Sequence, residues 1–116
     1  MTEAIPFSDL RKELSNWKAT FESFITNKTQ SLPAEILTAG GNDLSVLFQN
    51  TVMSGSDASD LAKKLAFQIN KNLLVAADIY SLKQKKDEYL PDYLTDEFEV
   101  TCKNIGKLID ELEQAS

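Results

Sequence analysis

One segment of this sequence constrains the fold more than any other, because residues 57–89 contain neither proline nor glycine. Those two residues are the strongest helix breakers, so nothing in the segment interrupts a helix. Apolar residues recur in it at the spacing of one helix face: Leu61, Leu65, Ile69, Leu73, Ala76 and Tyr80. A neighbouring face carries Phe67, Leu74 and Leu82. The pattern predicts a long central helix over about residues 57–89, apolar around most of its circumference near its middle.

The same spacing predicts two further helices, one near each end of the chain. The first has the stripe Leu10, Leu14, Trp17, Phe21, Phe24 and Ile25. The last has the stripe Leu94, Phe98, Cys102, Ile105, Ile109 and Leu112. Side-chain oxygens favour helix N-termini because they accept a hydrogen bond from a free backbone amide. We therefore expect Ser8 to cap the first helix, Asp57 or Ser59 the long helix, and Thr95 the last.

Two short helices are expected between the first helix and the long one. Pro33 suits a first helical position, and a helix from Pro33 to Ala39 is predicted. The two glycines that follow end it, and Asn42 or Asp43 caps the next element. Residues 44–53 fit either a short helix or an isolated strand. The helix is preferred because the sequence offers no second strand to pair with it.

These segments together predict an all-α fold, a single domain over residues 1–116 built as a four- to five-helix bundle. A straight helix over residues 61–89 would extend about 43 Å, whereas a compact domain of this size has a diameter of about 35 Å. Three solutions are open: a kink at Asn70 or Asn72, an elongated bundle, or a helix end that packs on a second chain. We expect an elongated bundle, and its assembly as a homodimer is left open.

The net charge of -6 is unevenly distributed along the chain. Residues 61–86 hold six lysines and one acidic residue, whereas residues 87–116 hold two lysines and nine acidic residues. A basic helix next to an acidic one can pair internally in an antiparallel hairpin, or it can present a charged face to a partner. Internal pairing is the simpler interpretation.

No reactive centre is indicated. The chain contains no histidine, which removes histidine triads and imidazole metal ligands. Cys102 lies on an apolar stripe with acidic neighbours, so we expect a buried structural cysteine rather than a thiolate. The aromatic residues are interpreted as core rather than as the lining of a cofactor cavity: Trp17, Phe21, Phe24, Phe48, Phe67 and Phe98. We expect no enzyme activity, no cofactor and no metal.

The sequence also disfavours a nucleic-acid-binding protein, a membrane-spanning protein and a secreted protein. Lysines near a helix C-terminus are stabilised by the helix dipole, and the acidic net charge opposes binding to phosphate, so no nucleic acid is expected as a partner. Asp78 closes the most apolar stretch, so no membrane span is expected. Glu3 and Pro6 interrupt any signal peptide, and a single cysteine favours a reducing compartment. A cytoplasmic location is predicted.

The remaining hypothesis is a non-enzymatic protein–protein interaction module: a subunit, an adaptor or a small inhibitory protein of the immunity type. It would present the acidic last helix, or the surplus apolar face of the long helix, to a protein partner, for which a basic one is expected. The candidate interface comprises Asp92, Asp96, Glu97, Glu99, Lys83, Lys85 and Lys86. The alternative is a bundle that binds a small apolar ligand between its helices, with polar orientation from Trp17, Asp78 and Tyr80.

Overall fold

The computed structural model describes residues 5–26, 32–53, 59–85 and 89–115. The elements in these ranges are α1 (Phe7–Ile25), a short 3-10 helix (Ala34–Leu37), α2 (Asp43–Thr51), α3 (Asp60–Lys83) and α4 (Asp92–Ala115). They include four α-helices and no strand. The predicted all-α bundle is confirmed.

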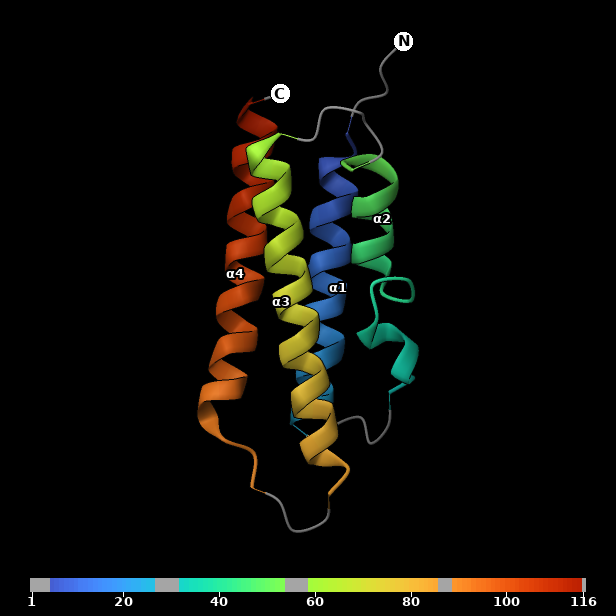
Figure 1. Cartoon of the computed structure of the whole chain (residues 1–116), viewed down its shortest axis with the longest axis vertical. Helices are drawn as coiled ribbons and strands as arrows, with labels where there is room; N and C mark the ends of the chain where they lie inside the picture. The colour runs from blue at the N-terminus through green and yellow to red at the C-terminus, as the bar shows by residue number, and fades with distance from the viewer. Residues whose placement is uncertain (1–4, 27–31, 54–58, 86–88, 116) are drawn as a thin grey trace.

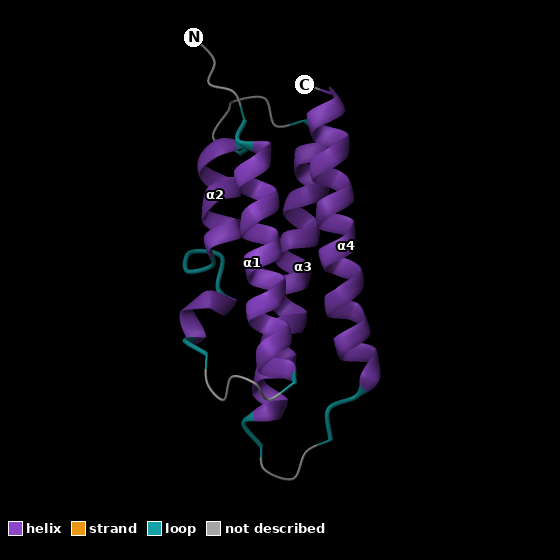
Figure 2. Cartoon of the chain, turned by 180° about the vertical axis from the view of Figure 1, so that it is seen from behind, coloured by secondary structure: helices purple, strands orange, loops and turns teal. Residues whose placement is uncertain are grey.

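Three long helices form the body of the molecule. α1, α3 and α4 run side by side along the long axis, and α2 packs against α1 toward one end (Figure 1 and Figure 2). α3 and α4 are antiparallel neighbours and share the most extensive contact between any two of these elements. The charged hairpin predicted from the sequence is therefore the α3–α4 pair.

The bundle is elongated, as expected. It measures 54 × 23 × 20 Å with a radius of gyration of 14.8 Å, against about 13 Å for a compact domain of this length. α3 has 24 residues and so extends about 36 Å. It ends six residues before the predicted position 89. At this end the Gln84 amide is shared between the Tyr80 and Ser81 carbonyls, and the Lys85 amide bonds to the Leu82 carbonyl three residues back, which tightens the chain. It continues without a break through Asn70 and Asn72, the two positions considered for a kink.

Two of the predicted caps are confirmed and two are wrong. Ser59 accepts a hydrogen bond from the Ala62 amide at 3.2 Å, and Asn42 accepts one from the Ser45 amide at 3.2 Å; Asp57 lies outside the described residues. α1 instead begins at Phe7, before Ser8, with no side-chain cap.

The last helix also begins earlier than predicted. α4 starts at Asp92, directly after Pro91, whose preset backbone and missing amide suit a helix start. Thr95 is therefore inside the first turn, where its hydroxyl donates to the Asp92 carbonyl at 2.9 Å. α1 likewise begins directly after a proline, Pro6.

The link between α1 and α2 departs from the prediction in the type of its first helix. The segment predicted as a helix from Pro33 to Ala39 is a 3-10 turn of four residues, Ala34–Leu37. The chain then folds back so closely at Gly41 that a β-carbon there would lie 2.2 Å from the Glu35 carbonyl oxygen. Only glycine fits that position. The helix predicted over residues 44–53 is confirmed as α2.

The core runs the length of the bundle and contains every residue of the predicted first and last stripes except Leu14 and Ile25, which are partly buried. An aromatic cluster lies at its centre, where the Phe21 ring is 4.7 Å from the Phe98 ring and 5.2 Å from that of Trp17. Phe67 was expected in the core and is 63% exposed. It lies two residues from both Leu65 and Ile69 and so points away from their face of the helix.

Two adjacent leucines of α3 give a direct test of this packing. Leu73 is 6% exposed and Leu74 is 68% exposed. Leu73→Ala should lower the free energy of unfolding by about 2–4 kcal/mol, because it removes buried methyl groups and leaves a cavity. Leu74→Ala should change it by no more than about 0.5 kcal/mol. Urea denaturation of dilute protein measures both values, and equal losses would contradict the assignment of the core face.

Candidate interaction surfaces

A buried polar network crosses the core between the three long helices. The indole Nε1 of Trp17 donates to Asn72 Oδ1 at 2.7 Å, which joins α1 to α3. Asn72 Nδ2 donates to Thr101 Oγ1 at 2.8 Å and also contacts the Phe98 carbonyl oxygen and Cys102 Sγ, each at 3.4 Å, on α4. Every hydrogen-bonding group of the Asn72 side chain is thus used inside the protein.

Sequence reasoning identified Asn72 only as a helix-averse residue. Its position carried a stronger signal, because it follows the buried Ile69 by three residues and so falls on the core side of α3. A buried amide needs partners, and those partners come from residues far away in the sequence. In the described part of the chain, no buried side-chain nitrogen or oxygen lacks a hydrogen-bond partner.

Cys102 is buried beside this network, as expected. Burial raises the pKa of its thiol from 9.0 to about 11, and the hydrogen bond from Asn72 offsets only part of that effect. The thiol is therefore protonated at neutral pH. A nucleophilic or metal-binding cysteine needs the opposite shift.

The four predicted acidic residues do not form one cluster. Glu97 faces α3, where its carboxylate lies 3.7 Å from Lys71 Nζ. Asp96 and Glu99 instead face α1 and line, with Glu22, a hollow of about 190 Å³ that we call the acidic groove. Asp92 is exposed at the start of α4. Because neighbouring helix positions point about 100° apart, consecutive acidic residues reach different surfaces.

The predicted basic residues are also separated. The Lys83 ammonium donates to the Ile25 carbonyl at 3.3 Å and lies 5.3 Å from the centre of the Phe24 ring. It offsets the partial negative charge of the carbonyl groups at the C-terminus of α1. Lys83 therefore stabilises the packing of α3 on α1. Lys85 is exposed beyond α3, and Lys86 lies outside the described residues.

The three residues of the alternative ligand pocket are not brought together. Trp17 lies against a hollow of about 130 Å³, smaller than the roughly 300 Å³ at which ligand pockets begin. Tyr80 stacks on Phe24 with ring centres 5.7 Å apart. Asp78 is exposed on α3. No shared site arises from these positions.

The apolar surface considered for the long helix lies on the side of the α3–α4 pair away from the core, and α4 contributes to it. Four large side chains lie there: Phe67 (63% exposed), Leu74 (68%), Tyr93 (66%) and Val100 (49%). Phe67 and Leu74 are seven residues apart on α3, and Tyr93 and Val100 are seven apart on α4, so each pair points the same way. We call this surface the outer α3–α4 face.

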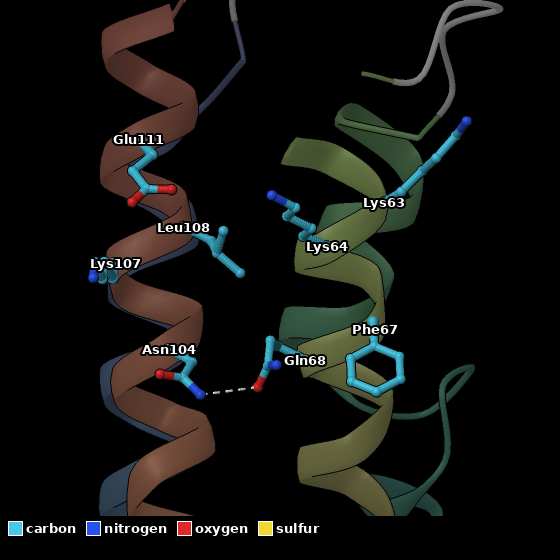
Figure 3. Close-up of a pocket in the computed structure, with 8 residues that line it drawn as sticks. All are labelled: Lys63, Lys64, Phe67, Gln68, Asn104, Lys107, Leu108 and Glu111. Carbon is cyan, nitrogen blue, oxygen red and sulfur yellow. Dashed lines mark hydrogen bonds between the residues drawn. The ribbon is translucent and has the colours of Figure 1, made fainter. Parts of the chain in front are cut away.

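A groove opens at the end of this face where α3 begins (Figure 3). It has a volume of about 450 Å³ and is lined by Lys63, Lys64, Phe67, Gln68, Asn104, Lys107, Leu108 and Glu111. The side chain of Leu108 reaches toward α3, and Asn104 donates across the groove floor to Gln68 at 3.2 Å. We call it the lysine groove, because three of its eight lining residues are lysines.

Comparison with protein-family models, with curated proteins and with solved structures finds no match for this chain. Among the residues that the structure describes, no helix is long and apolar enough to cross a membrane. Over the same ranges, no group of three or more histidine, cysteine or acidic residues could hold a metal ion. Function is therefore inferred from surface geometry.

The buried network yields a prediction about stability. Asn72→Leu keeps the branched shape of the side chain but leaves the Trp17 indole N–H without an acceptor, so it should cost about 1–3 kcal/mol. Adding Trp17→Phe removes the unpaired donor, and the double variant should lose less than the sum of the single variants by about 0.5–3 kcal/mol. Urea unfolding followed by circular dichroism measures the four proteins of this cycle.

Asn70→Leu is the matched control, because Asn70 is exposed on the same helix. It should change the unfolding free energy by no more than about 0.5 kcal/mol. Strictly additive losses in the cycle would show that Trp17 and Asn72 do not depend on each other.

Proposed function

We propose that this chain is a non-enzymatic protein–protein interaction module, a subunit, adaptor or small inhibitory protein, that docks another protein chain on its outer α3–α4 face. The observation that carries the proposal is the exposure of Phe67, Leu74, Tyr93 and Val100 on one side of one helix pair. Scattered apolar residues are normal on protein surfaces, but a group of them framed by polar residues is typical of a binding site. Aromatic side chains are also the usual anchors of such sites.

The surroundings of the four apolar residues support the same reading. The Lys71–Glu97 ion pair at 3.7 Å and the Gln68–Asn104 hydrogen bond at 3.2 Å lie between the two helices beside them. Lysines frame the groove at one end. An apolar centre with a polar rim is the common anatomy of protein interfaces.

The acidic groove has a secondary role in this proposal. Asp96, Glu99 and Glu22 would favour a basic partner, as expected from the sequence. Exposed charges of this kind raise the rate and selectivity of association more than its strength. The apolar face is therefore assigned the docking role, and a basic region on the partner is assigned to the acidic groove. A cytoplasmic location belongs to the same proposal and rests on the single cysteine.

A second candidate function, the binding of a small apolar ligand, is favoured by the size of the lysine groove. Its volume of about 450 Å³ lies within the range of roughly 300–1,000 Å³ that is usual for ligand pockets. The groove is open along the surface and differs from the predicted pocket at Trp17. A long-chain fatty acid would suit it, with its tail against Phe67 and its carboxylate at a lysine.

Photo-crosslinking tests the docking face. A benzoylphenylalanine placed at Phe67 should give a discrete protein adduct in an extract of the source cells, because a bound partner covers that side chain. The same group placed at Gln49, which is exposed on α2, is the matched control and should give none. Leu74→Glu should remove the Phe67 adduct, because a charge in the apolar centre opposes docking.

Equal labelling from both positions, or no adduct from Phe67, would contradict docking on this face. Titration with a fatty acid tests the second candidate function, the binding of a small apolar ligand. A fatty acid bound in the lysine groove should reduce the yield of the Phe67 adduct. A ligand bound between the helices, as first predicted, should shift the emission of Trp17, the single tryptophan.

A further inference from the structure

Two hydrogen bonds fix the levels of α3 and α4 against each other. Asn104 donates to Gln68 at 3.2 Å, and Asn72 donates to Thr101 at 2.8 Å. Because the two helices are antiparallel, each residue forward on α4 matches one residue back on α3. The apolar residues of α4 on the outer side then lie level with these positions of α3: Leu108 with position 64, Val100 with about position 73 and Tyr93 with about position 80.

The apolar side chains of the outer α3–α4 face therefore lie at three levels, which we call the apolar row. The first level holds Leu108 and Phe67, the second holds Leu74 and Val100, and the third holds Tyr93. Successive levels are about 10 Å apart, and the whole row extends about 24 Å. Helices packed side by side repeat their contacts at this interval, because two turns return a helix to the same face.

The apolar row begins in the lysine groove and continues along the face. Phe67 lines the groove, and Leu74 follows it by seven residues on α3. Lys107 lines the groove, and Val100 precedes it by seven residues on α4. Residues seven apart on a helix point nearly the same way. The groove and the row are thus parts of one surface.

The groove end of the row has cations without partners. Lys63, Lys64 and Lys107 line the groove, and within the described ranges none of the three makes an ion pair. Figure 3 shows Lys64 reaching across the opening toward α4. Glu111 lines the same groove, and Asp60 is exposed at the start of α3. Among the described residues around the opening, three lysines outnumber two carboxylates, so a carboxylate from a docking chain is favoured there.

We propose that the partner docks on the outer α3–α4 face through a single amphipathic helix of about 16 residues, which lies lengthwise between α3 and α4. The apolar stripe of that helix covers the apolar row. Acidic residues at one end of it reach the lysines of the groove. The proposal rests on the proposed function and names the binding element of the partner.

A helix fits the apolar row better than an extended strand. The apolar stripe of a helix returns to one face every two turns, which is about 10 Å and equals the spacing of the row. A strand presents a side chain to one face about every 7 Å. The surface beneath the helix is already paired, through the Gln68–Asn104 hydrogen bond and the Lys71–Glu97 ion pair. Covering it therefore buries no unsatisfied polar group.

The proposed helix leaves the acidic groove open. That groove is lined by Glu22 of α1 and lies on the α1 side of α4, away from the apolar row. A basic region elsewhere on the same partner can therefore still reach it. The two charged sites would then contact different parts of one partner.

Peptide selection on the full chain tests the proposal. A displayed library of random peptides, long enough to form such a helix, would be selected on the immobilised protein. Enriched sequences should have apolar residues at helical spacing and acidic residues at one end. For a selected peptide, Leu74→Glu and the double variant Lys64→Glu/Lys107→Glu should each raise the dissociation constant about tenfold or more. Lys12→Glu, on the exposed side of α1, is the matched control and should leave it unchanged.

Charge reversal in the peptide separates contact from a general effect of the variant. A peptide whose acidic residues are replaced by lysines should bind the Lys64→Glu/Lys107→Glu variant more tightly than it binds the unaltered protein, because opposite charges meet again. Circular dichroism should show a gain of helix when the original peptide binds.

Enriched peptides without helical spacing, or equal binding of the original peptide to the Lys64→Glu/Lys107→Glu variant, would overturn the inference. Failure to enrich any peptide would also overturn it. A dimer that Leu74→Glu dissociates, or a fatty acid bound in the lysine groove, would then name the occupant instead. The proposed function is tested separately, because it stands if Phe67 still gives a Leu74-dependent adduct with a protein and fails without that adduct.

Discussion

The buried amide of Asn72 fixes how the three long helices lie against one another. It takes a hydrogen bond from Trp17 on α1 and gives one to Thr101 on α4, within a core that is otherwise almost wholly apolar. If the core were wholly apolar, one helix could slide along another by a turn, because each apolar side chain would still contact an apolar neighbour. Sliding at Asn72 would leave a buried amide unpaired at a cost of about 1–3 kcal/mol. The network therefore selects one register, as buried polar residues do in coiled coils.

The same helix register determines which side chains meet on the surface of the molecule. Once Thr101 is held beside Asn72, Asn104 reaches Gln68 and Glu97 reaches Lys71 on the solvent side of the same helix pair. The apolar residues of the outer α3–α4 face then lie along one helix pair, with the lysine groove at the end where α3 begins. A polar contact in the core thus determines which groups a docking chain meets outside.

Helical periodicity was sufficient to predict the elements of the bundle but not the polar contacts. The stripes of α1 and α4 were identified because apolar spacing is a local property of the sequence. The caps at Ser8 and Thr95 were wrong because both helices begin earlier, each directly after a proline. The role of Asn72 could not be derived locally, since its partners lie 55 and 29 residues away. The net charges of the sequence segments also did not show that Glu97 and Asp96 face opposite sides of α4.

Hydroxyl-radical footprinting tests the central claim, that this protein acts through the outer α3–α4 face, most directly. Oxidation of side chains would be compared between dilute purified protein and protein at high concentration or in native extract. The account predicts protection of Phe67, Leu74 and Tyr93, with unchanged oxidation of Leu47 on α2. Protection of α2 with continued oxidation of Phe67, Leu74 and Tyr93 would contradict it.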